Sequence, residues 1–166
     1  MPGGFDRTPS VTGYFMNIYE TELNDDLLTK MIQLSEDWKA ENSCTGYRVN
    51  EKADIEGNRI FLAEDNDKII GYLFGKTCRA QDMSSVMAEG TLYFEVEELY
   101  VIPERRSQGI GQALFNYAEE TVKPEAEYIV LSTATKNWKA ILHFYLEELN
   151  MNFWNARMYK KIQEEL

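Results

Sequence analysis

The sequence predicts an α/β fold built as a single domain over residues 1–166, with a hairpin and a meander of strands at its centre. The first observation is the order of elements, because apolar runs typical of strands alternate with segments that have helical spacing. The second is size and composition, since 166 residues with 44% hydrophobic and 13% aromatic side chains can bury a substantial core. The third is that no internal repeat, low-complexity tract or linker divides the sequence.

The first elements are expected to be a strand and a helix. Gly13–Glu20 is rich in Tyr, Phe, Met and Ile, which favours a strand. Asn24 can cap a helix that runs to about residue 40, since two aspartates follow it. One face of this helix consists of Leu27, Leu28, Met31, Ser35 and Trp38. From Ala40 to Asn58 the pattern becomes polar, and a short helix or a mobile loop is expected there.

Three strands are expected in the middle of the chain. Arg59–Glu64 and Lys68–Lys76 are joined by a link rich in turn-forming residues, which predicts a hairpin. An irregular polar connection over Thr77–Gly90 then leads to a long strand over Thr91–Ile102.

The last third of the chain is expected to alternate between helices and strands. A helix with glycines at its start should end near Val122, before a proline. Tyr128–Ser132 is a short apolar run typical of a buried strand, and Asn137–Leu149 returns to helical spacing. Phe153–Ile162 is expected to close the chain as a mixed aromatic strand, so that the full order is β-α-(α)-β-β-β-α-β-α-β.

The segment that joins the long strand to the glycine-rich helix start predicts an anion-binding cradle. From Val101 to Gln112 it reads Val-Ile-Pro-Glu-Arg-Arg-Ser-Gln-Gly-Ile-Gly-Gln. The first N–H groups of a helix have no intrahelical partner and lie at the positive end of its dipole, which suits a phosphate or pyrophosphate. Gly109 and Gly111 let an anion approach the backbone, and Arg106 adds a positive charge.

This cradle differs from two common phosphate-binding loops. It lacks the Gly-Lys-Ser/Thr of the P-loop, because Gln112-Ala113 stands in that place, and it lacks the third glycine of the dinucleotide fingerprint. The remaining pattern, Arg106-x-x-Gly109-x-Gly111 behind a Val-x-Pro strand end, resembles the pyrophosphate loop of the GNAT superfamily of acyl-CoA-dependent N-acetyltransferases.

A second block of sequence extends this resemblance to nearly the whole chain. Residues 137–145 contain Asn-x-x-Ala-Ile-x-x-Phe-Tyr, which is similar to the family's Asn-x-x-Ala-x-x-x-Tyr helix. The end of this helix departs from the family, since a glycine-free Leu149-Asn150 stands where a Leu-Gly-Phe is usual. The resemblance implies a GNAT-like acyl-CoA N-acyltransferase fold with a mixed central sheet, helices on both faces, and acetyl-CoA as the co-substrate.

The resemblance also implies which residues contact acetyl-CoA. The N–H groups at the start of the glycine helix and the Arg106 side chain would hold the pyrophosphate. The preceding strand would offer main-chain groups to the pantetheine arm and the acetyl oxygen, and Asn137 would bind the pantetheine or cap its own helix. Ser107 stands where relatives often carry glycine or a basic residue. The implied cofactor-binding residues are Leu99, Val101, Arg106, Ser107, Gln108, Gly109, Ile110, Gly111, Gln112 and Asn137.

Three glutamates on the long strand are candidates for the base that deprotonates an amine before it attacks. Because side chains alternate, Glu95 and Glu97 are expected on the face of Leu99 and Val101, with Glu98 on the other. By resemblance the base is Glu97 or, two residues earlier, Glu95. The structural alternative is a solvated pair of glutamates that only keeps the strand soluble.

The proton donor to the departing thiolate is expected on the second motif. By resemblance Tyr145 is the general acid, whose phenol would protonate the CoA sulfur. The alternative is an aromatic residue of the core, since it lies with Phe144 on an apolar stripe. A single histidine and two cysteines without metal-ligand spacing predict no metal site.

The formal net charge of −11 limits the classes of partner. Such a chain repels nucleic acid and anionic membrane, so neither is an expected partner. The acidic surface attracts a cationic amine or only confers solubility. No apolar run long enough for a membrane span and no signal peptide is visible, and the cysteine usage favours a reducing cytoplasm.

The predicted function is transfer of an acetyl group from acetyl-CoA to a primary amine, of a small molecule or of a protein, with a slight preference for the small molecule. The alternative from another class is a non-catalytic acyl-CoA-binding or sensor module on the same fold. Aromatic side chains in the last expected strand (Phe153, Trp154 and Tyr159) also suggest a homodimer.

Overall fold

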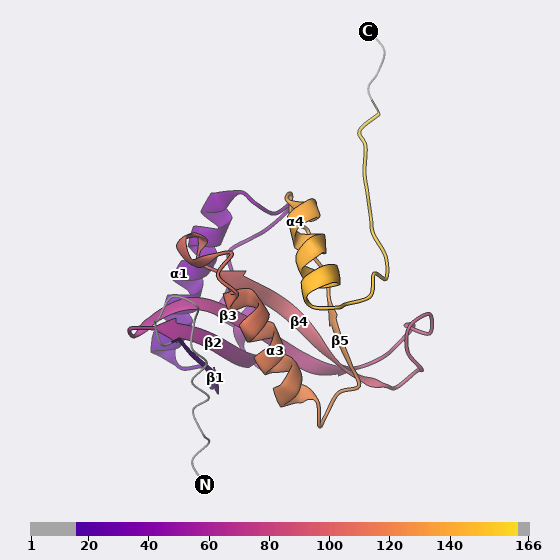
Figure 1. Cartoon of the computed structure of the whole chain (residues 1–166), viewed down its shortest axis with the longest axis horizontal. Helices are drawn as coiled ribbons and strands as arrows, with labels where there is room; N and C mark the ends of the chain where they lie inside the picture. Colours follow the sequence, from indigo (N-terminus) through magenta and orange to yellow (C-terminus); the bar gives the residue numbers. More distant parts are fainter. Residues whose placement is uncertain (1–15, 163–166) are drawn as a thin grey trace.

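A five-stranded mixed sheet runs through the molecule (Figure 1), and a computed structural model describes it over residues 16–162. The strands follow one another in space as they do in sequence, with antiparallel pairing from β1 to β4 and a parallel β5 beside β4. Their bounds are β1 Asn17–Thr21, β2 Arg59–Asp65, β3 Lys68–Arg79, β4 Leu92–Val101 and β5 Tyr128–Leu131. The expected hairpin is β2–β3, and the part of the first expected strand before residue 16 lies outside the described residues.

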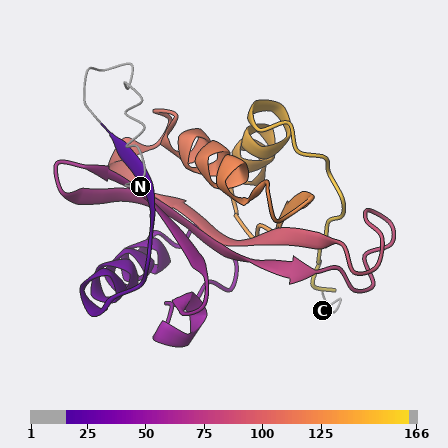
Figure 2. The ribbon, with the colours of Figure 1, turned by 90° about the horizontal axis from the view of Figure 1, so that it is seen from below.

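Helices cover both faces of this sheet, as Figure 2 shows. One face carries α1 (Asp25–Glu41) and the short α2 (Lys52–Ile55). The other carries α3 (Ile110–Val122) and α4 (Trp138–His143), which continues as the π-helical turn η2 (Phe144–Glu148). A 3-10 turn, η1 (Pro103–Arg105), joins β4 to α3. The expected mixed sheet with helices on both faces is therefore confirmed. None of the helices in residues 16–162 is long and apolar enough to cross a membrane.

Local sequence explains where the two long helices lie. The Asn24 side chain accepts a 2.8 Å hydrogen bond from the N–H of Leu27, and α1 ends where Asn42 adopts a left-handed conformation. In α3 the buried residues recur at helical spacing, and they face the sheet core. They are Ile110, Leu114, Phe115, Ala118 and Val122.

The last predicted strand is wrong. Within the described part of the chain, residues 153–162 form no strand, and they are exposed along their length. The chain contacts the core through Leu149 and Met151 and then leaves it (Figure 1). A strand needs a partner for its main-chain groups, and this segment has none in a single copy of the protein.

Candidate functional site

The predicted cradle lies between the end of β4 and the start of α3. Ser107 has a φ of 59° and Gly109 a φ of 81°, so the turn contains two left-handed residues. Such turns make successive N–H groups converge on a concave surface. Gly109 is the N-cap of α3, and no side chain in the described residues caps it. A Cβ at Gly109 would meet nothing within 4 Å, so the approach to these amides is open.

The guanidinium of Arg106 is held beside the cradle by α1. Its Nη1 lies 2.9 Å from Oε2 of Glu41, and its Nε donates to the Val101 carbonyl at 2.9 Å. The hydroxyl of Tyr100 donates to the same carboxylate at 2.8 Å. The end of α1 is thus tied to the turn before α3. The phosphate contact of Arg106 stays a prediction, and it requires this ion pair to open or to be shared.

The strand that leads into the cradle loses a neighbour part of the way along. Pairing between β4 and β5 ends where Val96 lies opposite Leu131, whereas β4 itself continues to Val101. The main chain around Leu99 and Val101 therefore has no β5 residue beside it. This is the stretch where the sequence predicts the pantetheine arm and the acetyl group.

A β-bulge in β4 changes which face the glutamates occupy. Gly75 pairs with Val96 and Phe74 with Glu98, so Glu97 is an extra residue in the strand. Phe94 and Val101 are an odd number of residues apart, yet both lie on the α3 face. The rings of Phe94 and of Tyr117 on α3 both lie against Phe61, and Val101 lies beside Gly111, also on α3.

The predicted separation of Glu95 from Glu98 is therefore wrong. Glu95 follows Phe94 and points to the α1 face, where Glu98 also lies with Tyr100, because Tyr100 stacks on Trp38 of α1 at 5.0 Å. The sequence-based expectation assumed unbroken alternation. The bulge resets that alternation, so Glu95 does not share the face of Leu99 and Val101.

The two predicted base candidates differ in their surroundings. Burial raises the pKa of Glu95, the negative charge of Glu97 raises it further, and Lys76 lowers it. Glu97 is exposed, and its Oε1 lies 3.6 Å from the Nζ of Lys76. A half-buried carboxylate with a raised pKa beside an exposed one can accept a proton from an amine.

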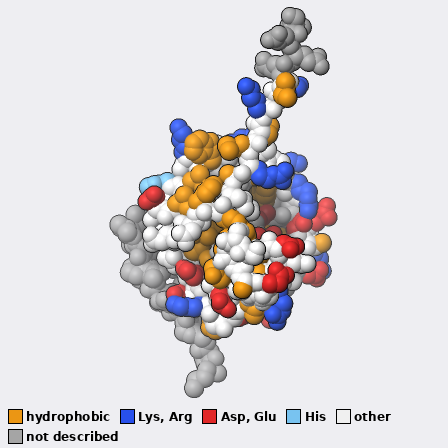
Figure 3. Space-filling model, turned by 90° about the vertical axis from the view of Figure 1, so that its right-hand side faces the viewer, with side chains coloured by type: hydrophobic (Ala, Val, Ile, Leu, Met, Phe, Trp, Pro, Cys, Tyr) orange, Lys and Arg blue, Asp and Glu red, His pale blue; other side chains and the backbone are white. Residues whose placement is uncertain are grey.

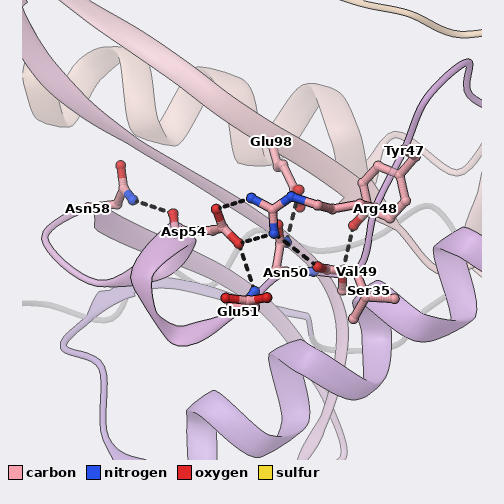
Figure 4. Close-up of polar contacts among 9 residues, drawn as sticks. All are labelled: Ser35, Tyr47, Arg48, Val49, Asn50, Glu51, Asp54, Asn58 and Glu98. Atoms are coloured by element: carbon pink, nitrogen blue, oxygen red, sulfur yellow. Dashed lines mark hydrogen bonds and ion pairs between the residues drawn. The ribbon is translucent and has the colours of Figure 1, made fainter.

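The third glutamate belongs to a polar network that the sequence does not predict, and Figure 4 shows its contact with Asn50. The Glu98 carboxylate accepts hydrogen bonds from the hydroxyl of Tyr72 at 2.8 Å and from Nδ2 of Asn50 at 2.9 Å. The N–H of Asn50 donates to Oγ of Ser35 at 2.8 Å, and that oxygen lies 2.7 Å from the Tyr47 hydroxyl. Burial raises the pKa of Glu98, although these hydrogen bonds oppose the rise.

The one sign of this network in the sequence is Ser35, a polar residue on the apolar face of α1. It is fully buried in the structure, and its partners come from distant parts of the chain. Beside the network the rings of Trp38 and Tyr47 lie 4.6 Å apart. A cavity of about 210 Å³ opens there, lined by Trp38, Lys39, Asn42, Ser43, Cys44, Gly46 and Tyr47.

Tyr145 lies on the π-helical turn η2 close to the cradle. Its neighbour Phe144 is the residue nearest to a Cβ built on Gly111, at 3.4 Å, and Gln112 donates a 3.3 Å hydrogen bond to the Glu148 carbonyl. Tyr145 is half-buried, and burial raises its pKa to about 12, with a smaller effect of Cys44 in the same direction. The phenol is therefore protonated at neutral pH and can act as a proton donor.

Asn137 stands at the N-cap position of α4, but its side chain makes no capping hydrogen bond. The capping role expected as one alternative is therefore wrong, and the contact with pantetheine stays a prediction. In residues 16–162, no three His, Cys, Asp or Glu side chains are grouped so that they could hold a metal ion.

Comparisons with known proteins agree with this architecture. Residues 16–151 match the model of the acetyltransferase (GNAT) family. No curated protein matches the chain significantly.

Among solved structures, an aminoglycoside acetyltransferase from an uncultured soil metagenomic sample is similar, with a TM-score of 0.64 and 14% identity over 89% of this chain and 97% of that one. A putative acetyl transferase from Pyrococcus furiosus has a TM-score of 0.64 and 16% identity over 89% and 99% of the two chains. A predicted acetyltransferase with acetyl-CoA from Clostridium acetobutylicum has a TM-score of 0.60 and 14% identity over 89% and 96%. The family model spans most of the sequence and the fold agrees with it, so this chain belongs to the acetyltransferase (GNAT) family.

Proposed function

We propose that this protein transfers an acetyl group from acetyl-CoA to a primary amine of a small molecule, by direct attack in a ternary complex. One observation carries the proposal: the amide cradle of α3, the part of β4 that extends beyond β5, and the turn with Tyr145 adjoin one another. In this order they suit the diphosphate, the thioester and the sulfur of acetyl-CoA.

The cradle would bind the diphosphate through the N–H groups of Gln108–Gln112, which span the exposed residues Gln108 and Gly109 and the first residues of α3, at the positive end of that helix. The thioester would then lie along Leu99 and Val101. A main-chain N–H directed at the developing oxyanion is worth roughly 3 kcal/mol of transition-state stabilisation. Asn137 would contact the pantetheine arm.

The amine nitrogen attacks the carbonyl carbon of the acetyl group, and the bond from that carbon to sulfur then breaks. Glu97 or Glu95 takes the proton that the amine must lose, directly or through a water molecule. Tyr145 donates its phenolic proton to the departing thiolate. The raised pKa values of Glu95 and Tyr145 support these roles, since the first favours proton uptake and the second keeps the acid protonated.

A small cationic acceptor is favoured by charge and by the aromatic cluster on the α1 face. The chain carries a net charge of −11, and the Trp38 and Tyr47 rings line the cavity on this face. A solved structure similar to this one is described as an aminoglycoside acetyltransferase in complex with sisomicin. Acetylation of a protein amine is the alternative acceptor class.

Cys44 and Cys78 are both free thiols, which supports a cytoplasmic location.

The acid is tested with Tyr145→Phe, and Tyr128→Phe on the exposed edge strand β5 is the control. Release of CoA thiol with a panel of amines is expected to show a kcat lower by about 100-fold or more for Tyr145→Phe. Acetyl-CoA affinity should stay within about twofold, because the phenol acts on the leaving group. An unchanged kcat would remove Tyr145 from the mechanism. CoA binding without turnover of any amine would instead support the non-catalytic acyl-CoA-binding or sensor module.

The base is tested by the pH dependence of kcat/KM in Glu97→Gln and Glu95→Gln, with Glu120→Gln on the surface of α3 as the control. A base must be deprotonated, so the rate falls as pH falls through its pKa. The variant that lacks the base should lose this limb. If Glu97 is not the base, removal of its negative charge should lower the pKa of Glu95. The fall in kcat/KM should then occur at lower pH in Glu97→Gln than in the wild type. A limb that is identical to wild type in both variants would contradict both assignments.

A further inference from the structure

The last residue of α1 is a glutamate that binds the arginine of the cradle through both of its oxygens. Oε1 of Glu41 accepts a hydrogen bond from Nη2 of Arg106 at 2.9 Å, and Oε2 lies 2.9 Å from Nη1. A two-point contact of this kind is the strong form of an arginine–carboxylate pair. The side chains of Glu41 and Arg106 are 18% and 42% exposed, so solvent screens the pair only in part.

Glu41 occupies an unfavourable position in its own helix. Because α1 runs from Asp25 to Glu41, this carboxylate lies at the negative end of the helix dipole. Its hydrogen-bond partners come from outside the helix. They are Arg106 and the hydroxyl of Tyr100, which donates to Oε1 at 2.8 Å. The contact with Arg106, and not helix formation, therefore accounts for a glutamate at this position.

Further contacts fix the guanidinium of Arg106 beside the cradle. Its Nε donates to the Val101 carbonyl at 2.9 Å, and its Cζ lies 5.5 Å from the centre of the Tyr100 ring. That ring stacks in turn on Trp38 of α1 at 5.0 Å. A guanidinium has five N–H donors, and the contacts with Val101 and Glu41 engage three of them. A phosphate would therefore meet an arginine whose charge a carboxylate already offsets.

Glu41 and a diphosphate thus compete for one cation. Arg106 stands three residues before Gly109, the N-cap of α3. A diphosphate that reaches Arg106 from the α3 amides would either displace the carboxylate or share the guanidinium with it. Displacement breaks an ion pair, and sharing brings two negative charges together. Either event weakens the binding of a ligand that carries the diphosphate, and acetyl-CoA and its product CoA carry the same one.

We propose that Glu41 is a positioning residue that acts through Arg106 and limits how tightly the cradle holds CoA. This rests on the function proposed above, since it requires the diphosphate to bind at the cradle. CoA keeps its diphosphate after the acetyl group has left. Competition by Glu41 therefore speeds the release of the product, while the chemical step at the thioester is unchanged.

Calorimetry with CoA tests the role of Glu41 in a double-mutant cycle with Arg106→Gln. Glu41→Gln removes the charge and keeps an oxygen that can accept from Tyr100. It is expected to lower the dissociation constant of CoA by about fivefold or more, because it removes a two-point ion pair. In the Arg106→Gln background the same change should alter the constant by less than about twofold. Equal effects in the two backgrounds would overturn the proposal.

The acidic surface of the protein also affects the binding of an anion. The net charge is −11, and Figure 3 shows Asp and Glu side chains spread over one face of the molecule. Glu36→Gln is the matched control, because it removes the same charge from an exposed position of the same helix. It should change the CoA dissociation constant by less than about twofold, since solvent screens exposed charges. An effect as large as that of Glu41→Gln would contradict a specific competition.

Kinetics separate an effect on the diphosphate from an effect on the chemical step. In Glu41→Gln the product-inhibition constant of CoA should fall with its dissociation constant. The value of kcat/KM for S-acetylpantetheine, which lacks the diphosphate, should stay within about twofold of the wild type. A larger change there, or a CoA dissociation constant that is unchanged or higher, would overturn this proposal and leave acetyl transfer in place. Failure of the wild type to bind CoA would overturn both.

Discussion

Glu98 is a carboxylate whose surroundings disfavour its charge. It lies on β4 among Tyr72, Asn50 and Tyr47, and burial raises its pKa despite the hydrogen bonds that it accepts. A buried carboxylate of this kind is retained at the expense of stability when it is ionised. It joins α1, the loop after it, β3 and β4 on the α1 face of the sheet, so it holds the strand that carries the predicted base.

The pH dependence of stability tests this description of Glu98. Its folded-state pKa lies above the unfolded value, so the folded protein loses stability as pH rises through that pKa. Each unit of difference corresponds to about 1.4 kcal/mol. Glu98→Gln removes this titration, and urea unfolding between about pH 4 and pH 8 should show its stability improving relative to wild type as pH rises. The exposed Glu120→Gln is the control, and a constant difference for Glu98→Gln would contradict the proposed cause.

At the scale of elements, the bulge in β4 determines which face of the sheet Glu95 occupies. It lies opposite the junction of Phe74 and Gly75 in β3, and it leaves Glu97 without a partner in the register. Gly75 permits this pairing, because a Cβ there would lie 2.1 Å from the carbonyl oxygen of Glu95. The absence of one side chain in β3 therefore allows the close approach that positions Glu95.

Gly75→Ala should consequently damage the β3–β4 pairing. We expect a loss of about 3 kcal/mol in the free energy of unfolding, together with lower acetyl transfer, since the backbone beside Glu95 must move. Gly111→Ala is the matched control for stability without CoA, because its Cβ would lie 3.4 Å from Phe144, within ordinary contact. Helix propensity should make it neutral or more stable by about 0.5–1 kcal/mol. Denaturant unfolding measures both, and equal effects of the two substitutions would contradict the steric explanation.

At the scale of the whole molecule, the proposed ligand would contact elements that are far apart in the sequence. The cradle follows β4, Arg106 is tied to α1 by Glu41, and the turn with Tyr145 packs at the start of α3. A ligand that binds only the folded arrangement stabilises all of these elements together.

Acetyl-CoA at about 100 times its dissociation constant should add about 2.7 kcal/mol to the free energy of unfolding. For a chain of this length that corresponds to a rise of about 5–10 °C in Tm. Gly109→Val places a side chain in the open approach to the cradle and strains the backbone at a φ of 81°, so the variant should be less stable without ligand and its own ligand-induced shift should be less than half as large. Thermal scans with and without acetyl-CoA measure these shifts within each variant. Equal shifts would place the ligand elsewhere.

The sequence by itself determined the parts of this protein that depend on local spacing. The cap at Asn24, the end of α3 at Val122, the β2–β3 hairpin and the Arg-x-x-Gly-x-Gly turn all lie within short stretches, and the structure has them where the patterns predict. The family resemblance also extended correctly to the mixed sheet with helices on both faces.

Only the tertiary structure decided the features that depend on contacts between distant residues. Glu95 lies on the opposite face of the sheet from the one expected, because the pairing with β3 at Gly75 introduces a bulge into β4. Alternation within one strand cannot reveal such a bulge. The network of Glu98 joins residues from Ser35 to Glu98 that share no sequence pattern. The last expected strand failed because a strand's main-chain hydrogen bonds are made with another strand, so an alternating pattern produces a strand only where a sheet edge is within reach.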